Sequence, residues 1–302
     1  MKKTILKVEN LKKWFPIKRS LSQVINRKRD YVKAVDGISF SIKKGEIFGL
    51  IGESGCGKTT TGKLIMKLLE PTAGKMIFND KNVTHLDAQG LSEHKRNVQM
   101  IFQDPYASMN PRFKAREVLK EPLIIHNIGS SKKEKTNMAL KALKEVKLTP
   151  PEKFMNRYAH MLSGGQRQRI ATARTLILSP SFIVADEPVS MVDLSTRAEI
   201  LHMMKEVQKD LNLTYLYITH DLSTARYFTD RIAVMYLGKL VEMGDVDKVI
   251  DNSLHPYTRA LIKAVSEPVS GKVNEIKELP IKGEIPSASD IPKGCRFHPR
   301  CI

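Results

Sequence analysis

The stretch EIFGLIGESGCGKTTTGKLIMKLLE, residues 46–70, decides the fold. It places an apolar, strand-like run before a glycine-rich turn and an amphipathic, helix-like run after it. The turn fits G-x-x-x-x-G-K-[ST], in which backbone N–H groups converge on phosphates and the next helix points its positive end at them. The residues predicted to line this nucleotide site are Gly52, Glu53, Ser54, Gly55, Cys56, Gly57, Lys58, Thr59 and Thr60.

Two side chains of this turn are expected to carry its chemistry. Lys58 would neutralise β- and γ-phosphate oxygens, and the Thr59 hydroxyl would bind Mg²⁺. Cys56 is interpreted as a small packing residue and not as a reactive thiol. A glycine-rich turn without function is disfavoured because the flanking strand and helix also match what the motif requires.

A second motif, FIVADEP at 182–188, follows the pattern of a buried strand that ends in two carboxylates. Ligands of open α/β sheets bind at the carboxyl ends of the strands, so Asp186 is placed to hold Mg²⁺. Glu187, the next residue, is placed to accept a proton from the attacking water. Together with the phosphate-binding turn, this pair predicts nucleotide hydrolysis.

A third motif, LSGGQ at 162–166, looks redundant in a chain that already has a phosphate-binding turn. Its serine and glycines offer a hydroxyl and backbone N–H groups at the start of a helix-like run. The redundancy disappears if the motif serves a nucleotide bound to a neighbouring subunit. We therefore expect Ser163, Gly164 and Gly165 to contact the γ-phosphate held by a partner's turn.

Around these motifs, strand-like and helix-like runs alternate, which predicts an α/β core with a helical insertion and a tail after about residue 250. The predicted strands are residues 37–42, 46–52, 75–80, 97–103, 181–186, 214–219 and 231–236. The predicted helices are residues 59–70, 133–148 and 195–211.

The composition narrows the class of protein. The 302 residues are 41% apolar and carry a formal charge of +18, and residues 1–33 hold eleven lysines and arginines against Glu9 and Asp30. This imbalance indicates a nucleic acid, a nucleotide or a lipid surface nearby, or simply a solvated face. Three cysteines favour a reducing compartment. The sequence shows neither a secretory leader nor an apolar run near the ~20 residues that cross a bilayer, so any membrane role would depend on partners.

Together the three motifs resemble the ATP-binding cassette (ABC) family over essentially the whole chain. The resemblance implies that Gln103 in IFQDP is the Q-loop residue, which contacts ATP and Mg²⁺, and that SMVD at 190–193 is the D-loop with Asp193 kept. It makes His220 in ITHD the switch histidine. It places Phe15 in LKKWFP against adenine, with Tyr31 as the alternative.

The resemblance also implies the architecture. We expect an α/β, ABC-type P-loop NTPase with a RecA-like core, an antiparallel β subdomain and a helical subdomain at about 105–165, all within residues 1–250. Residues 251–302 would form a short C-terminal extension. Two such subunits would pack head to tail around two ATP molecules, each pocket combining the Walker motifs and His220 of one subunit with Ser163, Gly164, Gly165 and Gln166 of the other.

Within this family, QDPYASMNPR at 103–112 and SLHPYTRALIKAV at 253–265 resemble the ATP-binding subunits of oligopeptide and dipeptide permeases. The opening WFPIK at 14–18 resembles their second, F-type, ATPase subunit. The resemblance implies a different ATPase as dimer partner, two transmembrane permease subunits and an extracytoplasmic solute-binding protein, with this chain peripheral at the cytoplasmic face. Close relatives import nickel or oligosaccharides. The basic insertion at 17–31 would lie near anionic lipid.

The tail ends in GCRFHPRCI at 294–302, and tails of this branch are associated with an iron–sulfur cluster. A cluster needs roughly four thiolates, whereas only Cys295 and Cys301 are present. We therefore expect either a truncated tail or a vestigial site. Zinc held by these two cysteines and His298 would be an incomplete site, and two free thiols are the favoured interpretation.

Two other classes of protein share part of this pattern. A soluble ABC ATPase that acts on nucleic acid or ribosomes would keep every ATP motif, but such chains generally carry two cassettes or large inserted modules, so no nucleic-acid partner is expected. A small-molecule kinase would leave LSGGQ and His220 without a role.

Overall fold

The computed structural model describes residues 2–17, 30–105, 109–265, 281–284 and 286–302. Most of the basic insertion at 17–31 lies outside the described residues. The chain divides into two compact units. The first unit comprises Met1–Lys43, Phe48–His85 and Ile218–Ile302, and the second comprises Lys44–Ile47 and Leu86–Tyr217.

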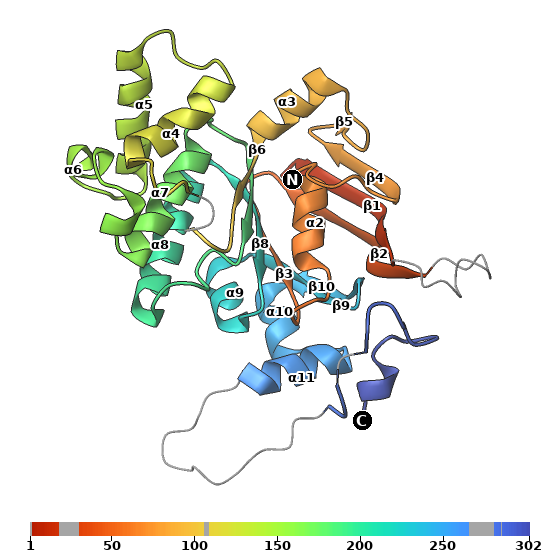
Figure 1. The fold of residues 1–302 in the computed structure, drawn as a ribbon. Helices are drawn as coiled ribbons and strands as arrows, with labels where there is room; N and C mark the ends of the chain where they lie inside the picture. The colour runs from red at the N-terminus through yellow and green to blue at the C-terminus, as the bar shows by residue number, and fades with distance from the viewer. Residues whose placement is uncertain (1, 18–29, 106–108, 266–280, 285) are drawn as a thin grey trace, which may run out of the picture. The chain divides into compact units, whose positions relative to one another are not determined.

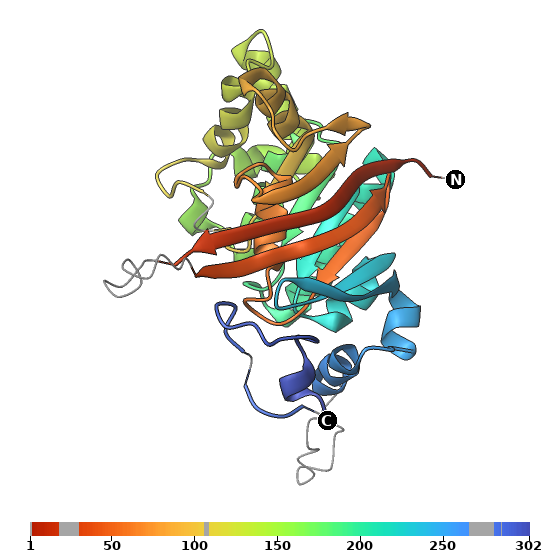
Figure 2. The ribbon, with the colours of Figure 1, turned by 90° about the vertical axis from the view of Figure 1, so that its right-hand side faces the viewer.

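An antiparallel sheet, with strand order β2-β1-β4-β5, forms part of the first unit (Figure 2). Its strands are β1 (Thr4–Pro16), β2 (Tyr31–Lys43), β4 (Ala73–Phe78) and β5 (Lys81–Asn82). Strand β1 buries Leu6, Val8 and Leu11, and it pairs with β2 on one side and β4 on the other. This sheet is the antiparallel β subdomain expected from the sequence.

A second set of strands in this unit carries the phosphate-binding turn. Strand β3 (Ile47–Ile51) pairs in parallel with β9 (Arg231–Tyr236), which pairs antiparallel with β10 (Lys239–Asp245). Every residue of β3 is buried. The chain leaves β3, makes the glycine-rich turn and enters α2 (Lys58–Ile65), as the motif requires (Figure 1).

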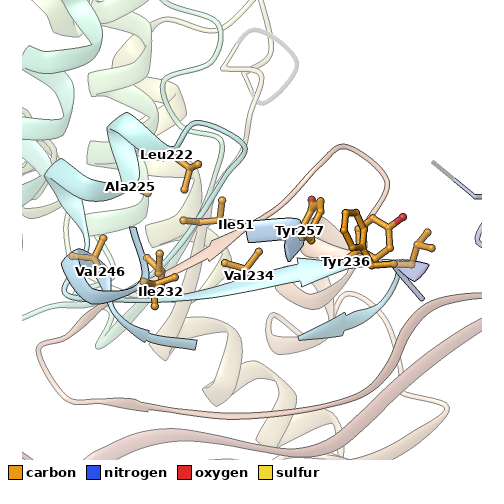
Figure 3. Packing of buried hydrophobic residues seen from close by; sticks show 11 residues of the cluster. Ile51, Leu222, Ala225, Ile232, Val234, Tyr236, Val246 and Tyr257 are labelled. Carbon is orange, nitrogen blue, oxygen red and sulfur yellow. The ribbon is translucent and has the colours of Figure 1, made fainter. Parts of the chain in front are cut away.

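The rest of the first unit packs against β3 and β9. It consists of α9 (Leu222–Phe228), α10 (Val246–Asp251), α11 (Pro256–Val265) and the short helix η2 (His298–Arg300). One apolar cluster joins these elements (Figure 3). Its members are Ile51, Leu222, Ala225, Ile232, Val234, Tyr236, Leu237, Val246, Val249, Tyr257 and Phe297. The C-terminal tail therefore shares a core with the strand that feeds the phosphate-binding turn.

The second unit holds parallel strands and the longer helices. Its strand order is β8-β7-β6, formed by β8 (Thr214–Thr219, the last two residues belonging to the first unit), β7 (Phe182–Asp186) and β6 (Val98–Ile101). The accompanying helices are α3 (Ala88–Asn97), α7 (Gly164–Leu176) and α8 (Leu194–Leu211). All residues of β7 and β8 are buried, which explains their apolar runs FIVA and YLYI.

Between β6 and α7 the second unit is helical. The elements are α4 (Ala115–Ile125), α5 (Lys132–Glu145), α6 (Pro151–Met155) and η1 (Ala159–Met161). Leu119, Leu123 and Leu143 are fully buried where α4, α5 and α7 pack together. Across the described ranges, no helix is both long enough and apolar enough to cross a membrane.

Candidate functional site

The phosphate-binding turn is shaped by glycines at two kinds of position. Gly57 has φ 112°, and a Cβ added there would lie 2.1 Å from the backbone oxygen of Ala34 in β2. Gly55 has φ 79°, but a Cβ there would meet nothing within 4 Å. Gly57 is therefore required by both conformation and space, whereas Gly55 is required by conformation alone.

Lys58 is buried and its ammonium turns back into the loop. It donates to the backbone oxygens of Gly52 at 2.7 Å and Glu53 at 2.9 Å. Helix α2 starts at Lys58, and its first turn has neither an acidic residue nor a side-chain cap. Backbone N–H groups at that end, beside a buried cation, fit the phosphates of ATP. Thr59, whose hydroxyl is the expected Mg²⁺ ligand, is the second residue of this helix.

Glu53 is held by two residues of the C-terminal region. Its backbone N–H donates to the Tyr257 hydroxyl at 3.0 Å. Its carboxylate accepts from both terminal nitrogens of Arg300, at 2.9 and 3.2 Å. The hydrogen bond to Glu53 raises the pKa of Arg300, and burial raises the pKa of Tyr257. Sequence analysis missed both residues, because pairs 204 and 247 positions apart leave no local pattern.

Cys56 is a packing residue at the other side of the turn. Burial raises the pKa of its thiol, so the reactive thiolate is disfavoured. Its backbone oxygen accepts from the N–H of Gly238 at 2.8 Å. The two remaining residues predicted at this turn lie on its outer side, Ser54 exposed and Thr60 half-buried.

His220 also lies in the first unit, where β8 meets α9. It is exposed and precedes Asp221, whose carboxylate caps α9 by accepting from the N–H groups of Ser223 at 2.9 Å and Thr224 at 3.3 Å. The Thr219 hydroxyl accepts from the Asp221 N–H at 3.0 Å. The backbone on either side of the histidine is therefore fixed, as a positioned functional side chain requires.

The two candidate adenine contacts lie in β1 and β2. Phe15 pairs with Val32, and the Lys13 ammonium lies 5.2 Å from the centre of the Phe15 ring. The Tyr31 ring lies 6.1 Å from that of Trp14. Consecutive residues of a strand point to opposite faces of the sheet. Phe15 therefore lies on one face, and Trp14 and Tyr31 lie on the other.

In the second unit, the Q-loop and the acidic pair come together. Asp186 is buried at the end of β7, and the Gln103 amide donates to the Glu187 carboxylate at 2.9 Å. Glu187 has φ 46°, a left-handed conformation that is rare for a side-chain-bearing residue and clusters at functional sites. The expected base and the expected Q-loop residue are thus in direct contact.

The D-loop continues from Glu187 and is fixed by its own hydrogen bonds. Ser190 donates to the Glu187 backbone oxygen through its N–H at 3.2 Å and its hydroxyl at 3.0 Å. Arg197 of α8 donates to the backbone oxygen of Val192 at 3.1 Å. Asp193 occupies the N-cap position of α8.

The LSGGQ motif forms the start of α7 and caps itself. The Ser163 hydroxyl accepts from the Gln166 N–H, and the Gln166 side chain accepts from the Ser163 N–H, both at 3.3 Å. This reciprocal pair is a capping box. Ser163 is exposed. A Cβ added to Gly165 would lie 2.6 Å from the Thr196 side chain of α8, and one on Gly164 would lie 3.7 Å from Val192.

The two cysteines of the tail lie in different environments. Cys295 is exposed, whereas Cys301 is half-buried and packs against the apolar cluster of the first unit. Both are free thiols. Within the residues that the structure describes, no group of three or more His, Cys, Asp and Glu side chains could hold a metal ion.

Comparison with known proteins identifies the family. Residues 35–190 match the model of the ABC transporter family. The chain belongs to that family. Residues 241–302 match the model of the oligopeptide/dipeptide transporter C-terminal region.

Several curated relatives match nearly the full length. The chain is 47% identical to the oligopeptide transport ATP-binding protein AppF of Bacillus subtilis, over 99% of this chain and 89% of that protein. It is 42% identical to the dipeptide transport ATP-binding protein DppF of Haemophilus influenzae, over 98% of this chain and 88% of that protein. Neither name is that of a kinase or of a protein acting on nucleic acid, so those two alternatives gain no support.

Solved structures match as well. A dimeric post-hydrolysis state of the ATP-binding cassette MJ0796, bound to ADP and Pi, is 30% identical with a TM-score of 0.68, covering 80% of this chain and 99% of that one. The cbiO1 structure from Clostridium perfringens is 26% identical with a TM-score of 0.70, covering 83% and 92%. The expected ABC-type P-loop NTPase fold is confirmed, and the chain is an ABC-type ATPase.

Proposed function

We propose that this chain hydrolyses ATP to power the import of oligopeptides or dipeptides through a membrane ABC transporter. The observation that carries the proposal is the pairing, in one chain, of the ABC transporter match at 35–190 with the oligopeptide/dipeptide transporter match at 241–302. Relatives named for oligopeptide and dipeptide transport, at 47% and 42% identity, support it.

On the first unit, the phosphate-binding turn would bind the ATP phosphates. Lys58 would exchange its loop carbonyl partners for β- and γ-phosphate oxygens, a small movement for a side chain already inside the loop. Phe15 would stack on adenine, with Tyr31 as the alternative. His220 would contact the γ-phosphate.

On the second unit, Glu187 would accept the proton of the attacking water. The hydrogen bond from Gln103 fixes the orientation of that carboxylate, so the base is held in place before the water arrives. Gln103 and Asp186 of this unit are proposed ligands of Mg²⁺, as is Thr59 of the first unit. When bound, Mg²⁺ would offset the negative charge that develops on the phosphate oxygens.

The LSGGQ residues would serve ATP bound to the partner subunit. Within the capping box the Ser163 oxygen acts as an acceptor, and its own O–H can still donate to a phosphate oxygen. Gly164 and Gly165 would add backbone N–H groups, with Gln166 and Asp193 beside them. The dimeric cassette structure among the matches supports an ATP site shared by two subunits.

The partners follow from the importer assignment. They are a second, different ABC ATPase, two transmembrane permease subunits and, indirectly, an extracytoplasmic solute-binding protein. The chain would work at the cytoplasmic face of the membrane, held there by the permeases. No nucleic-acid partner is proposed.

The test uses the Glu187→Gln variant, which should bind MgATP but turn over about 10²–10⁴-fold more slowly, since it lacks the base. The tagged variant would be expressed in the native host and its membranes solubilised with MgATP. Co-purifying proteins would then be identified by mass spectrometry. Glu206→Gln, the same change at an exposed residue of α8, is the matched control.

The expected result is enrichment, with Glu187→Gln over Glu206→Gln, of two multi-span membrane proteins and a second ABC ATPase. Uptake of labelled peptide by that complex, compared with nickel and oligosaccharide, then identifies the solute. Recovery of ribosomes or nucleic acid without membrane proteins would remove the transport assignment, and wild-type turnover by Glu187→Gln would remove the proposed base.

A further inference from the structure

The phosphate-binding turn is not held by its own residues alone. Glu53 forms hydrogen bonds with Lys58, Tyr257 and Arg300. Its backbone oxygen accepts from the Lys58 ammonium at 2.9 Å, and its N–H and carboxylate are bound by Tyr257 and Arg300. Any displacement of Glu53 therefore moves a carbonyl that holds the phosphate-binding lysine.

The Arg300 contact is built as a rigid pair. Both terminal nitrogens of the guanidinium bind the two carboxylate oxygens of Glu53, and only 7% of the Arg300 side chain is exposed. The guanidinium also lies over the Tyr236 ring, 5.9 Å from its centre. Two-point pairing fixes orientation as well as distance, which a single-point contact does not.

Tyr257 and Arg300 share one support. Tyr257 and Tyr236 lie side by side in Figure 3, with ring centres 4.6 Å apart, and the Phe297 ring lies 5.4 Å from that of Tyr236. These rings are fully buried in the apolar cluster that joins α11 and the tail to β9. This buried cluster therefore holds the Tyr257 hydroxyl, on α11, and the Arg300 guanidinium, in the tail, against Glu53.

A second arm of the tail reaches the other side of the same turn. Arg296 donates to the Leu237 backbone oxygen and to the Asp36 carboxylate. The next residue, Gly238, donates its N–H to the Cys56 backbone oxygen at 2.8 Å. The tail thus supports the loop at Glu53 directly and at Cys56 through the turn at 237–238.

We propose that Arg300 is a positioning residue for ATP binding, which acts through Glu53 to hold the backbone of the phosphate-binding turn in the conformation that accepts the nucleotide. Tyr257 contributes to the same constraint. The proposal rests on the proposed ATP-binding role of Lys58. Without the clamp, a smaller fraction of molecules has a competent loop, and the apparent dissociation constant rises by the inverse of that fraction. Once ATP is bound the loop is complete, so the rate of turnover is little changed.

The experiment measures MgATP affinity for the purified full chain and the kinetics of ATP hydrolysis for the complex that the chain forms with its partner ATPase. Arg300→Ala is expected to raise both Kd and KM roughly fivefold to tenfold, with kcat within about twofold of wild type. Arg300→Lys keeps the charge but loses the two-point pairing and should recover only part of the affinity. In a Glu53→Ala background, Arg300→Ala should add almost nothing, because its partner is already absent.

The matched control is Arg226→Ala. Arg226 makes the same kind of two-point pair, with Asp251 at 2.9 and 3.0 Å, but on the exposed face of α9. It should leave Kd, KM and kcat unchanged. Thermal unfolding of each variant checks that the fold is intact. If Arg300→Ala does not fold, Tyr257→Phe removes only the hydroxyl that binds Glu53 and is expected to raise Kd about twofold to threefold.

Three outcomes would overturn the inference. They are an unchanged Kd in folded Arg300→Ala and Tyr257→Phe, an equal effect from Arg226→Ala, or a full additional effect of Arg300→Ala in the Glu53→Ala background. A wild-type chain that fails to bind MgATP would instead overturn the proposed function, so the two failures can be told apart.

Discussion

The phosphate-binding turn and the LSGGQ turn both place glycines at the start of a helix, yet they are held in opposite ways. LSGGQ closes on itself, since Ser163 and Gln166 are three residues apart and cap each other. The phosphate-binding turn depends on Arg300, 247 positions away, and on Tyr257, 204 positions away. The conformation of LSGGQ is therefore set by neighbouring residues, whereas that of the phosphate-binding turn is set partly by residues of the C-terminal region.

The largest effect that separates the two turns is expected at Ser163. Ser163→Arg should reduce turnover at least about 10²-fold, because a bulky cation replaces a donor aimed at the partner's γ-phosphate. MgATP affinity of the isolated chain should stay at the wild-type value, since the proposal assigns that turn to the partner's nucleotide. Steady-state hydrolysis and equilibrium binding check the two parts.

The control for that change is Ser131→Arg. Ser131 also caps a helix, by accepting from the Glu134 N–H at 3.1 Å, so both variants should lose about 1 kcal/mol of unfolding free energy. Only Ser163→Arg should lose turnover. Weakened MgATP binding by the isolated Ser163→Arg chain would contradict the assignment of this turn to the partner's site.

An intermediate effect is expected from two glycines of the phosphate-binding turn. Gly57→Ala and Gly55→Ala both force a side chain into a left-handed conformation, which costs about 1–2 kcal/mol. Only Gly57→Ala also overlaps a backbone atom, the Ala34 oxygen at 2.1 Å. We expect MgATP affinity to fall roughly tenfold further in Gly57→Ala than in Gly55→Ala. The affinities would be measured by titration calorimetry. Equal losses of affinity in the two variants would show that the close approach of Gly57 to the Ala34 oxygen does not determine the conformation of the turn.

The smallest effect is a pH dependence of the second arm of the tail. Burial raises the pKa of Asp36, but the hydrogen bonds from Arg296 and Trp14 lower it by more. The pKa of Asp36 is therefore below its usual value. A lowered folded-state pKa gives stability that is fully present above the unfolded pKa of about 4 and is lost as the pH falls through the folded value. Thermal unfolding between pH 3 and 6 should therefore be less pH-dependent in Asp36→Asn than in wild type. Identical pH slopes would exclude the contribution.

Much of the fold could be predicted because the buried strands are made mostly of apolar residues. The expected strands at 214–219 and 231–236 coincide with β8 and β9. The helix expected at 59–70 was too long, since α2 ends at Ile65. The reason lies in Lys67, which takes φ 55° and donates to the Thr84 oxygen at 2.6 Å. That partner is remote in sequence, so the end of the helix could not be predicted locally.

Strand β1 was not predicted although it spans thirteen residues. Its positions outside the core include Lys7, Glu9, Lys12 and Lys13. Its alternation is broken by shifts in register around Asn10, which has φ 47°. Because the register shifts partway along the strand, its apolar residues do not recur at every second position. Hydrophobicity alone therefore does not indicate a strand here. The functional site shows the same contrast between features set by local sequence and features set by remote residues. The motif residues could be predicted from their local spacing, whereas Tyr257, Arg296 and Arg300 could not.

The distance in sequence between Glu53 and Arg300 has a consequence for synthesis. A ribosome that has added Glu53 must add 247 more residues before the ion pair can form. At about 5–20 residues per second this takes roughly 12–50 s. Throughout that interval the nascent nucleotide site lacks its last support. Newly made chains would therefore acquire full affinity for ATP only after Arg300 has been added.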